Sequence, residues 1–283
     1  MKKYYTVADL NFSVEADTKH YALMNNYNNF ETNPKSNIIF SLTIKNETYN
    51  GIYHTETQQE DEGQEIICGI TNESESVFVY NNLNQHVGTM VCNNTYTTAT
   101  LYTTDNNDEK LAIDNSLMIL YALSSAQYSA MLFHASVVSL RSKAYMFLGK
   151  SGTGKSTHSR LWLNNIEGTA LVNDDNPIVR IYNDIIKVYG SPWSGKTPCY
   201  HSIEYPLGAI VLLSQAKENK IKQIKGIHAY AAIRPSISGK RWDKNIADNL
   251  HNSENTLIQR VAVYHLECLP NKEAALLCQS TIE

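Results

Sequence analysis

The sequence predicts an α/β protein in two parts, a β-rich N-terminal domain over residues 1–112 and an α/β domain over residues 113–283. In the first part, short apolar runs alternate with polar clusters, a pattern typical of antiparallel strands joined by turns. In the second part, an apolar run enters a glycine-rich loop, and a helical segment follows the loop. The two patterns indicate different architectures on the two sides of the boundary.

The N-terminal part contains three clear apolar runs, at residues 37–44, 65–70 and 76–80. Polar clusters rich in Asn and Asp separate the runs, for example at residues 81–84 and 104–108. Because Asn and Asp favour turns, we expect a sheet of antiparallel strands here. No catalytic constellation occurs in this part, so we expect it to cover the site of the second domain or to select its substrate.

The α/β domain is expected to begin with a helix over residues 113–132, where apolar side chains such as Leu117 and Tyr121 follow helical spacing. Two apolar runs come next, at residues 136–140 and 144–148. A short polar segment joins these runs, so they are predicted to form a hairpin. The second strand of this hairpin leads directly into the glycine-rich loop.

The remainder of the chain is predicted to contain short strands and helices in alternation. The expected elements are a helix at residues 158–164, a strand at 169–173, a hairpin of strands at 178–182 and 185–189, a strand at 207–213, and a mainly helical segment from 228 to 283 with one strand at 261–266. The hairpins on both sides of the loop indicate antiparallel pairs within its sheet.

The composition excludes several classes of protein. The chain is 42% hydrophobic and 18% charged, so it can bury a core and is not a disordered polyelectrolyte. A net charge of −4 disfavours a dedicated nucleic-acid binder, which usually carries a basic face. We therefore expect no nucleic-acid partner.

Cysteine usage and hydropathy indicate the cellular compartment that we expect for the protein. The five cysteines are odd in number and form no C-x-x-C pair, which is typical of reduced thiols in a cytoplasmic protein. The N-terminal residues lack the apolar stretch of a signal peptide. Residues 115–140 carry no formal charge, but several serines and other polar residues interrupt them, so we expect a buried helix and strand rather than a membrane span.

The glycine-rich loop matches the pattern G-x-x-x-x-G-K-[ST] in full. Its residues are Gly149-Lys150-Ser151-Gly152-Thr153-Gly154-Lys155-Ser156, and Thr157 follows them. Glycines let the backbone N–H groups of such a loop turn toward one anion, and the next helix adds its N-terminus. Lys155 would then neutralise the β- and γ-phosphates of a nucleotide, while the Ser156 hydroxyl joins the shell of Mg²⁺. Loop and strand context together predict nucleotide binding by residues 149–157.

Two acids end the apolar strand that follows the loop helix, Asp174 and Asp175. A phosphate-binding enzyme keeps its metal-positioning carboxylate at such a place. One aspartate can hold Mg²⁺, for which we expect Asp174, and the other can accept a proton from a hydroxyl substrate. The alternative is that Asp174–Pro177 is a polar turn with no chemical role.

Three further residues are candidates for the site. His134 lies in an apolar run, where a histidine is either a satisfied core residue or an active-site group. Lys196 follows a small Ser-Gly turn, and Arg234 lies in a segment that ends with Lys240 and Arg241. Each cation could neutralise a transferred phosphate, and the alternative for both is a solvated surface charge.

These residues, in this order, resemble the catalytic domain of HPr kinase/phosphorylase. That family carries a histidine ahead of its phosphate loop, a loop of this glycine pattern, and an aspartate pair at the end of the next strand. The same superfamily includes ATP-dependent phosphoenolpyruvate carboxykinase. The resemblance covers roughly residues 130–240 and implies a mixed-sheet P-loop kinase domain of the HPr kinase/carboxykinase type. It also implies that His134 is an active-site residue.

The resemblance implies an ATP- and Mg²⁺-dependent kinase that transfers the γ-phosphate to a serine-type hydroxyl on a protein, a peptide or a small molecule. Lys155, Asp174, Asp175 and His134 would do the chemistry, with Lys196 and Arg234 as further cations. Two alternatives stay open, a carboxykinase-like lyase and a nucleotide-binding docking module without chemistry. The sequence leaves open the nucleotide base, any reverse phosphorylase reaction and whether the chain forms a homo-oligomer.

Overall fold

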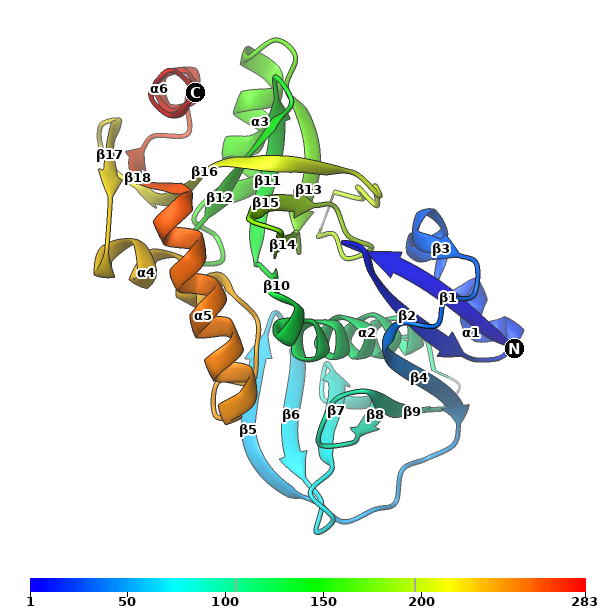
Figure 1. Ribbon diagram of the computed structural model, residues 1–283. Helices are drawn as coiled ribbons and strands as arrows, with labels where there is room; N and C mark the ends of the chain where they lie inside the picture. Colours follow the sequence, from blue (N-terminus) through cyan, green and yellow to red (C-terminus); the bar gives the residue numbers. More distant parts are fainter. Residues whose placement is uncertain (105, 196) are drawn as a thin grey trace. The chain divides into compact units, whose positions relative to one another are not determined.

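The computed structural model describes residues 1–104, 106–195 and 197–283 (Figure 1). The chain divides into two compact units, Met1–Ser124 and Ser125–Glu283. The sequence predicts a boundary after residue 112, and the difference between the two positions is one helix. The protein is thus a mixed α/β chain with one large mixed sheet in each unit.

The first unit is built on a nine-stranded sheet in the order β3-β1-β2-β4-β9-β8-β7-β6-β5. Its strands are β1 (Lys2–Val7), β2 (Leu10–Glu15), β3 (Glu31–Thr32), β4 (Ile38–Asn46), β5 (His54–Asp61), β6 (Gln64–Ile70), β7 (Ser76–Asn82), β8 (Gln85–Cys92) and β9 (Thr98–Thr103). The predicted apolar runs correspond to β4, β6 and β7. A short helix α1 (Thr18–Ala22) and a 3-10 turn η1 (Asn25–Phe30) lie between β2 and β3.

The expectation of a purely antiparallel sheet in this unit is wrong at β4. That strand pairs in parallel with both β2 and β9, whereas the other pairs are antiparallel. Parallel neighbours need a crossover, and the chain supplies one on each side. Residues 16–37 connect β2 to β4, and the four strands β5 to β8 connect β4 to β9. Turn residues in the sequence could not predict these long crossover connections.

Helix α2 (Glu109–Ser125) groups with the first unit because its side chains bond to that unit's strands. The Tyr121 hydroxyl donates to the Val7 carbonyl oxygen at 2.9 Å. The Ser116 hydroxyl donates to the Tyr80 hydroxyl at 3.2 Å, and both groups are buried. These contacts explain why the first unit extends beyond residue 112.

The predicted helix over residues 113–132 is wrong at its C-terminal end. The helix stops at Ser125, and a 3-10 turn η2 (Ala126–Tyr128) and strand β10 (Ala130–Leu132) follow. The Ser125 hydroxyl donates to the Ala130 carbonyl oxygen at 3.2 Å, and Ser129 has a φ of 53°. A serine side chain that bonds the backbone, followed by a left-handed residue, ends the helix despite its apolar spacing.

The second unit contains a nine-stranded sheet, again mixed. Seven strands follow the order β10-β14-β15-β16-β12-β11-β13, β18 pairs with β16, and β17 pairs with β18. These strands are β11 (Ala135–Leu140), β12 (Lys143–Leu148), β13 (Ala170–Asp175), β14 (Ile178–Tyr182), β15 (Ile185–Tyr189), β16 (Glu204–Gln215), β17 (Lys220–Ile224) and β18 (Ala262–Cys268). The predicted hairpins β11–β12 and β14–β15 both occur.

The helices of the second unit are α3 (Lys155–Asn165), α4 (Ile227–Ile233), α5 (Lys244–Arg260) and α6 (Lys272–Ile282), with a 3-10 turn η3 (Arg234–Ser236) after α4. This agrees with the predicted helical C-terminal segment. Strand β17 is not among the elements predicted from the sequence. Its residues Lys220–Ile224 alternate with charges and stay largely exposed, so the segment lacks the apolar run that marked the other strands.

Helix α3 anchors the glycine loop to the core of the second unit. Trp162 is fully buried and contacts the rings of Tyr145 and Phe147, with centroids 5.4 and 5.5 Å away. Its indole Nε1 donates to Nε2 of the buried His158 at 3.1 Å. Since an aromatic residue of this size contributes several kcal/mol when buried, α3 is held firmly against β12.

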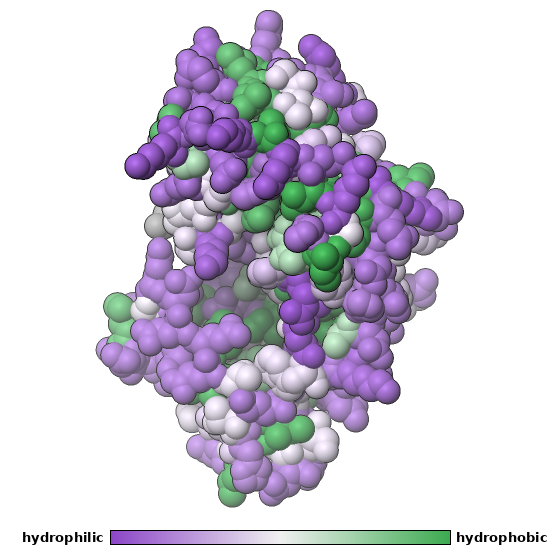
Figure 2. Space-filling view, turned by 90° about the vertical axis from the view of Figure 1, so that its left-hand side faces the viewer, coloured by the Kyte–Doolittle hydropathy of each residue, from purple (hydrophilic) through white to green (hydrophobic). Residues whose placement is uncertain are grey.

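The surface is largely polar. Figure 2 shows hydrophilic side chains over much of one side, with hydrophobic ones in scattered patches. Large hydrophobic residues with high exposure, such as Ile52, Ile227 and Leu83, come from separate elements. Within the described part of the chain, no helix has both the length and the apolar character that crossing a membrane requires.

Candidate active site

The register of three strands brings the predicted site residues to one end of the second sheet. Ala135 pairs with Asp175 across β11 and β13, and Ser136 pairs with Phe147 across β11 and β12. The start of β11 therefore lies beside the ends of both β12 and β13. His134 immediately precedes β11, and the glycine loop immediately follows β12.

The glycine loop, residues 149–156, leads into α3 without a capping side chain. Gly154 is the residue before the helix and has a φ of 107°, and Gly152 has a φ of 74°. Both angles lie in the left-handed region that favours glycine. No side chain accepts from the first N–H groups of α3, which begins at Lys155. These N–H groups and the helix dipole give the loop the properties of an anion site.

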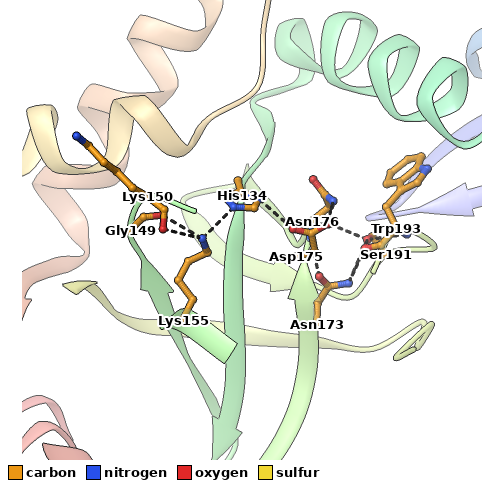
Figure 3. A network of polar contacts seen from close by, with 9 residues as sticks. All are labelled: His134, Gly149, Lys150, Lys155, Asn173, Asp175, Asn176, Ser191 and Trp193. Atoms are coloured by element: carbon orange, nitrogen blue, oxygen red, sulfur yellow. Dashed lines mark hydrogen bonds and ion pairs between the residues drawn. The ribbon is translucent and has the colours of Figure 1, made fainter. Parts of the chain in front are cut away.

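Lys155 turns back over the loop that carries it. Its Nζ lies 3.0 Å from the Gly149 carbonyl oxygen and 2.9 Å from Nε2 of His134 (Figure 3). Burial lowers the pKa of Lys155, and the carboxylates of Asp175 and Asp174 partly oppose that shift. The ammonium group is thus held near the loop by neutral acceptors and by nearby negative charge.

His134 connects the lysine to an aspartate. Its Nδ1 lies 3.0 Å from Oδ1 of Asp175, on the opposite side of the ring from the contact with Lys155. A charged lysine can only donate, so Nε2 accepts and the ring proton is assigned to Nδ1, which donates to the carboxylate. The side chain is 47% exposed. His134 is therefore not a buried core histidine, which was the alternative from sequence.

Asp175 is held in place by its neighbours. The Asn176 side chain donates from Nδ2 to Oδ2 of Asp175 at 2.9 Å. The backbone N–H of Asn176 in turn donates to Oδ1 of the buried Asn173 at 2.9 Å. The Ser191 hydroxyl donates to the Asn176 carbonyl oxygen at 2.6 Å and accepts from Nδ2 of Asn173 at 3.2 Å (Figure 3). Asn173, Asn176 and Ser191 thus form a hydrogen-bonded brace that holds Asp175.

Asp174 lies deeper than its neighbour and is only 7% exposed. Its carbonyl oxygen accepts from the Gly195 N–H at 2.8 Å, and Asp175 forms an isolated β-bridge with Ser194. The Ser194–Gly195 segment is therefore bonded to the aspartate pair. Lys196, which the sequence analysis placed in this segment, lies outside the described residues.

Arg234 lies in η3, close in sequence to residues that bond the His134 segment. The His134 N–H donates to the Ser236 carbonyl oxygen at 2.7 Å, and the Ser238 N–H donates to the Leu132 carbonyl oxygen at 2.9 Å. Arg234 itself is exposed and, with Tyr230, lines an open hollow. The backbone thus brings the segment next to the histidine, while a role for the Arg234 side chain stays a prediction.

Ser156 and Asp174 are the residues of this site that could hold Mg²⁺ beside a nucleotide. Ser156 and Asp174 offer a hydroxyl and a carboxylate, the oxygen ligands that Mg²⁺ prefers. Among the described residues, no group of three or more His, Cys, Asp or Glu could hold a metal ion. Magnesium in nucleotide sites takes few protein ligands together with phosphate and water, so such a group is not required.

The sequence pattern indicates the candidate site residues but not the residues that support them. Asn173 and Ser191 are fully buried and hydrogen-bonded to each other, and Asn176 orients Asp175. A signal for Asn173 was present, because an amide inside an apolar strand next to two acids needs buried partners. Ser191 lies far along the chain and gave no such signal.

Comparison with known proteins shows no family for this chain. No family model matches the chain. No curated protein matches it either. A solved structure, the HPr(Ser) kinase/phosphatase from Coxiella burnetii, is similar with a TM-score of 0.32 and 12% identity, covering 53% of this chain and 91% of that chain. Because this similarity is low, the case for function depends on the geometry of the site.

Proposed function

We propose that this protein is an ATP- and Mg²⁺-dependent kinase that transfers the γ-phosphate to a hydroxyl of serine type. One observation carries the proposal: Lys155, His134 and Asp175 form a continuous row of contacts at the glycine loop, with distances of 2.9 and 3.0 Å. A cation that can bind phosphate therefore lies in contact with a carboxylate–histidine pair. Phosphoryl transfer to a hydroxyl uses the cation to stabilise phosphate charge and the pair to accept the proton of the hydroxyl.

Each residue has a distinct role in this proposal. The N–H groups of the loop and of the start of α3 hold phosphate oxygens, and Lys155 neutralises their charge. Ser156 and Asp174 would hold Mg²⁺, which would supply positive charge against the charge that develops on the transferred group. Asp175 accepts the proton of the attacking hydroxyl, directly or through His134.

Lys155 has two sets of partners in this proposal. In the structure it bonds to His134 and to the Gly149 carbonyl oxygen. When it turns toward phosphate, Nε2 of His134 loses its donor and becomes a free acceptor. The acceptor hydroxyl can then donate to a histidine whose opposite nitrogen is held by Asp175, an arrangement that favours proton removal. The identity of the acceptor, protein or small molecule, follows from the experiment below.

Phosphorus NMR of the purified protein tests the proposal. The protein is mixed with Mg·ATP and with dialysed or undialysed extract of its source organism, and a Lys155→Ala variant serves as the control. A new phosphoester resonance that requires Lys155 is the expected result. Its appearance only with undialysed extract would identify a small-molecule acceptor. Unchanged ATP in every mixture, with binding intact, would reject the kinase and favour a docking module.

A further inference from the structure

The sheet of the first unit ends at one side in a long strand with an open edge. Strand β5 is last in the strand order, and among the described residues β6 is its one strand partner. The opposite edge is β3, which has only two residues. An edge strand presents unpaired backbone N–H and C=O groups and can accept another strand. Eight residues are long enough for such pairing.

Both faces of β5 are open as well as its edge. Seven of its eight residues are exposed, and the other, Thr57, is half-buried. By contrast, the first five residues of β7, two strands inward, are all buried. A strand that borders solvent on both faces contributes little to the core of its own sheet. Its edge and both of its faces are therefore accessible.

The charge around this edge has one sign. Residues 46–109 contain eleven acidic side chains and no lysine or arginine. Glu60 and Asp61 lie on β5, and Glu65 lies on β6. No ion pair between described residues includes any of these three carboxylates. These three carboxylates thus carry negative charge that no ion pair among the described residues neutralises.

Two of these acids face each other directly. Glu60 pairs with Glu65 across β5 and β6, and Glu65 pairs with Asn81 across β6 and β7. Asn81 donates to Glu65 at 2.5 Å, and Gln58 also donates to it, so neutral amides satisfy Glu65. Like charges at directly opposite positions destabilise a sheet. A cation on a further strand, beside Glu60, would relieve this repulsion.

We propose that β5 is a docking edge for a basic, extended segment of a partner protein, which adds to the sheet as a further strand. Backbone hydrogen bonds to the edge supply affinity, and lysine or arginine at alternate positions supplies complementarity to Glu60 and its neighbours. A second copy of this chain is disfavoured as the occupant, because two β5 strands would bring their acids together. This inference is independent of the proposed kinase activity.

A labelled peptide tests the docking edge on the full chain. The probe is a short fluorescent peptide of alternating lysine and threonine, followed by anisotropy at low and physiological salt. The control peptide has glutamate in place of lysine. Two further peptides carry N-methyl groups on alternate residues, one in each phase, so that each blocks one edge of the peptide backbone. Strand addition uses one edge only, so one phase is expected to abolish binding and the other to retain it.

Charge reversal at the edge gives a second readout. Glu60→Lys is expected to weaken binding of the lysine peptide roughly fivefold to tenfold, because an attractive cross-strand pair becomes repulsive. Glu73→Lys makes the same charge change in the turn after β6 and is expected to leave binding within about twofold. Circular dichroism checks that each variant is folded, and Glu60→Gln replaces Glu60→Lys if it is not.

Four outcomes would overturn the inference. Equal binding by both N-methylated peptides, or equal loss in Glu60→Lys and Glu73→Lys, would mean diffuse attraction to an acidic surface. No binding of the lysine peptide at low salt would mean that the acids only keep the edge unpaired. Concentration-dependent dimerisation that Glu60→Lys changes would assign the edge to a second copy.

Discussion

The two sheets of this protein are similar in size and differ in what lies at their strand ends. Both have nine strands among the described residues, and both mix parallel and antiparallel pairs. In the second sheet, three strand ends bring a glycine loop, a histidine and two aspartates together. In the first, β7 and β8 are joined by a tight turn at Leu83 and Asn84. The candidate site residues therefore lie at and just beyond strand ends of the second sheet, and the first sheet has no such cluster in its described turns.

The largest expected effect is on stability, at the core contact that Trp162 of α3 makes beneath the glycine loop. Trp162→Ala should lower the free energy of unfolding by about 3–5 kcal/mol, because it leaves a large cavity between α3 and β12. Trp242→Ala provides the control, since Trp242 is 48% exposed and should cost under about 1 kcal/mol. Urea denaturation measures both. Equal effects would mean that α3 does not anchor the loop.

Asp175, which the brace holds, should affect the rate of phosphoryl transfer and not the affinity for the nucleotide. Asp175→Asn should lower the rate of phosphoryl transfer by roughly a hundredfold to a thousandfold, because it removes the proton acceptor. Its affinity for Mg·ATP should change little. Asp248→Asn, in the exposed face of α5, serves as the control. An unchanged rate in Asp175→Asn would shift the role of base to another residue.

The buried histidine of α3 predicts a dependence of stability on pH. Burial lowers the pKa of His158 from 6.5 to about 4. Between these two values the unfolded chain binds the proton and the folded chain does not, so stability should fall as pH drops from 6.5 to about 4. The loss from this group reaches about 3 kcal/mol at most, from 1.36 kcal/mol for each pKa unit.

His158→Gln isolates that contribution. Glutamine can still accept from Trp162 but does not titrate. The difference in unfolding free energy between the two proteins should therefore change between pH 6.5 and 4, and level off below pH 4. Chemical denaturation across this range measures it. A difference that stays constant with pH would contradict the buried neutral histidine.

The smallest expected effect concerns the brace. Asn173→Ala removes the acceptor of the Asn176 N–H and the donor to Ser191, so it should loosen Asp175. The transfer rate should fall about tenfold, and stability by about 1–3 kcal/mol, because buried polar partners lose their bonds. Asn252→Ala, at an exposed amide of α5, is the control. Loss of stability with a normal rate would make the brace purely structural.

The sequence predicted the parts of this protein that depend on local pattern. The hairpins at residues 136–148 and 178–189, the loop and its helix follow from apolar runs, turns and glycines. The sequence did not predict what depends on distant partners. The parallel pairing of β4 and the bond between Asn173 and Ser191 arise from segments far apart in the chain. The early end of α2 has a local cause, a serine–backbone bond and a left-handed serine that the apolar spacing does not reveal. His134 lies between these two cases. Its local pattern is that of a core residue, and only the resemblance to a family predicted it as a site residue.

The central claim is that the glycine loop and its lysine bind a nucleotide. Calorimetric titration of the protein with Mg·ATP tests it most directly, with Lys155→Ala and the exposed-lysine control Lys143→Ala measured alongside. We predict binding by the unmodified protein and by Lys143→Ala, and loss of binding by about a hundredfold or more in Lys155→Ala. No binding by the unmodified protein, or equal binding by all three, would contradict the claim.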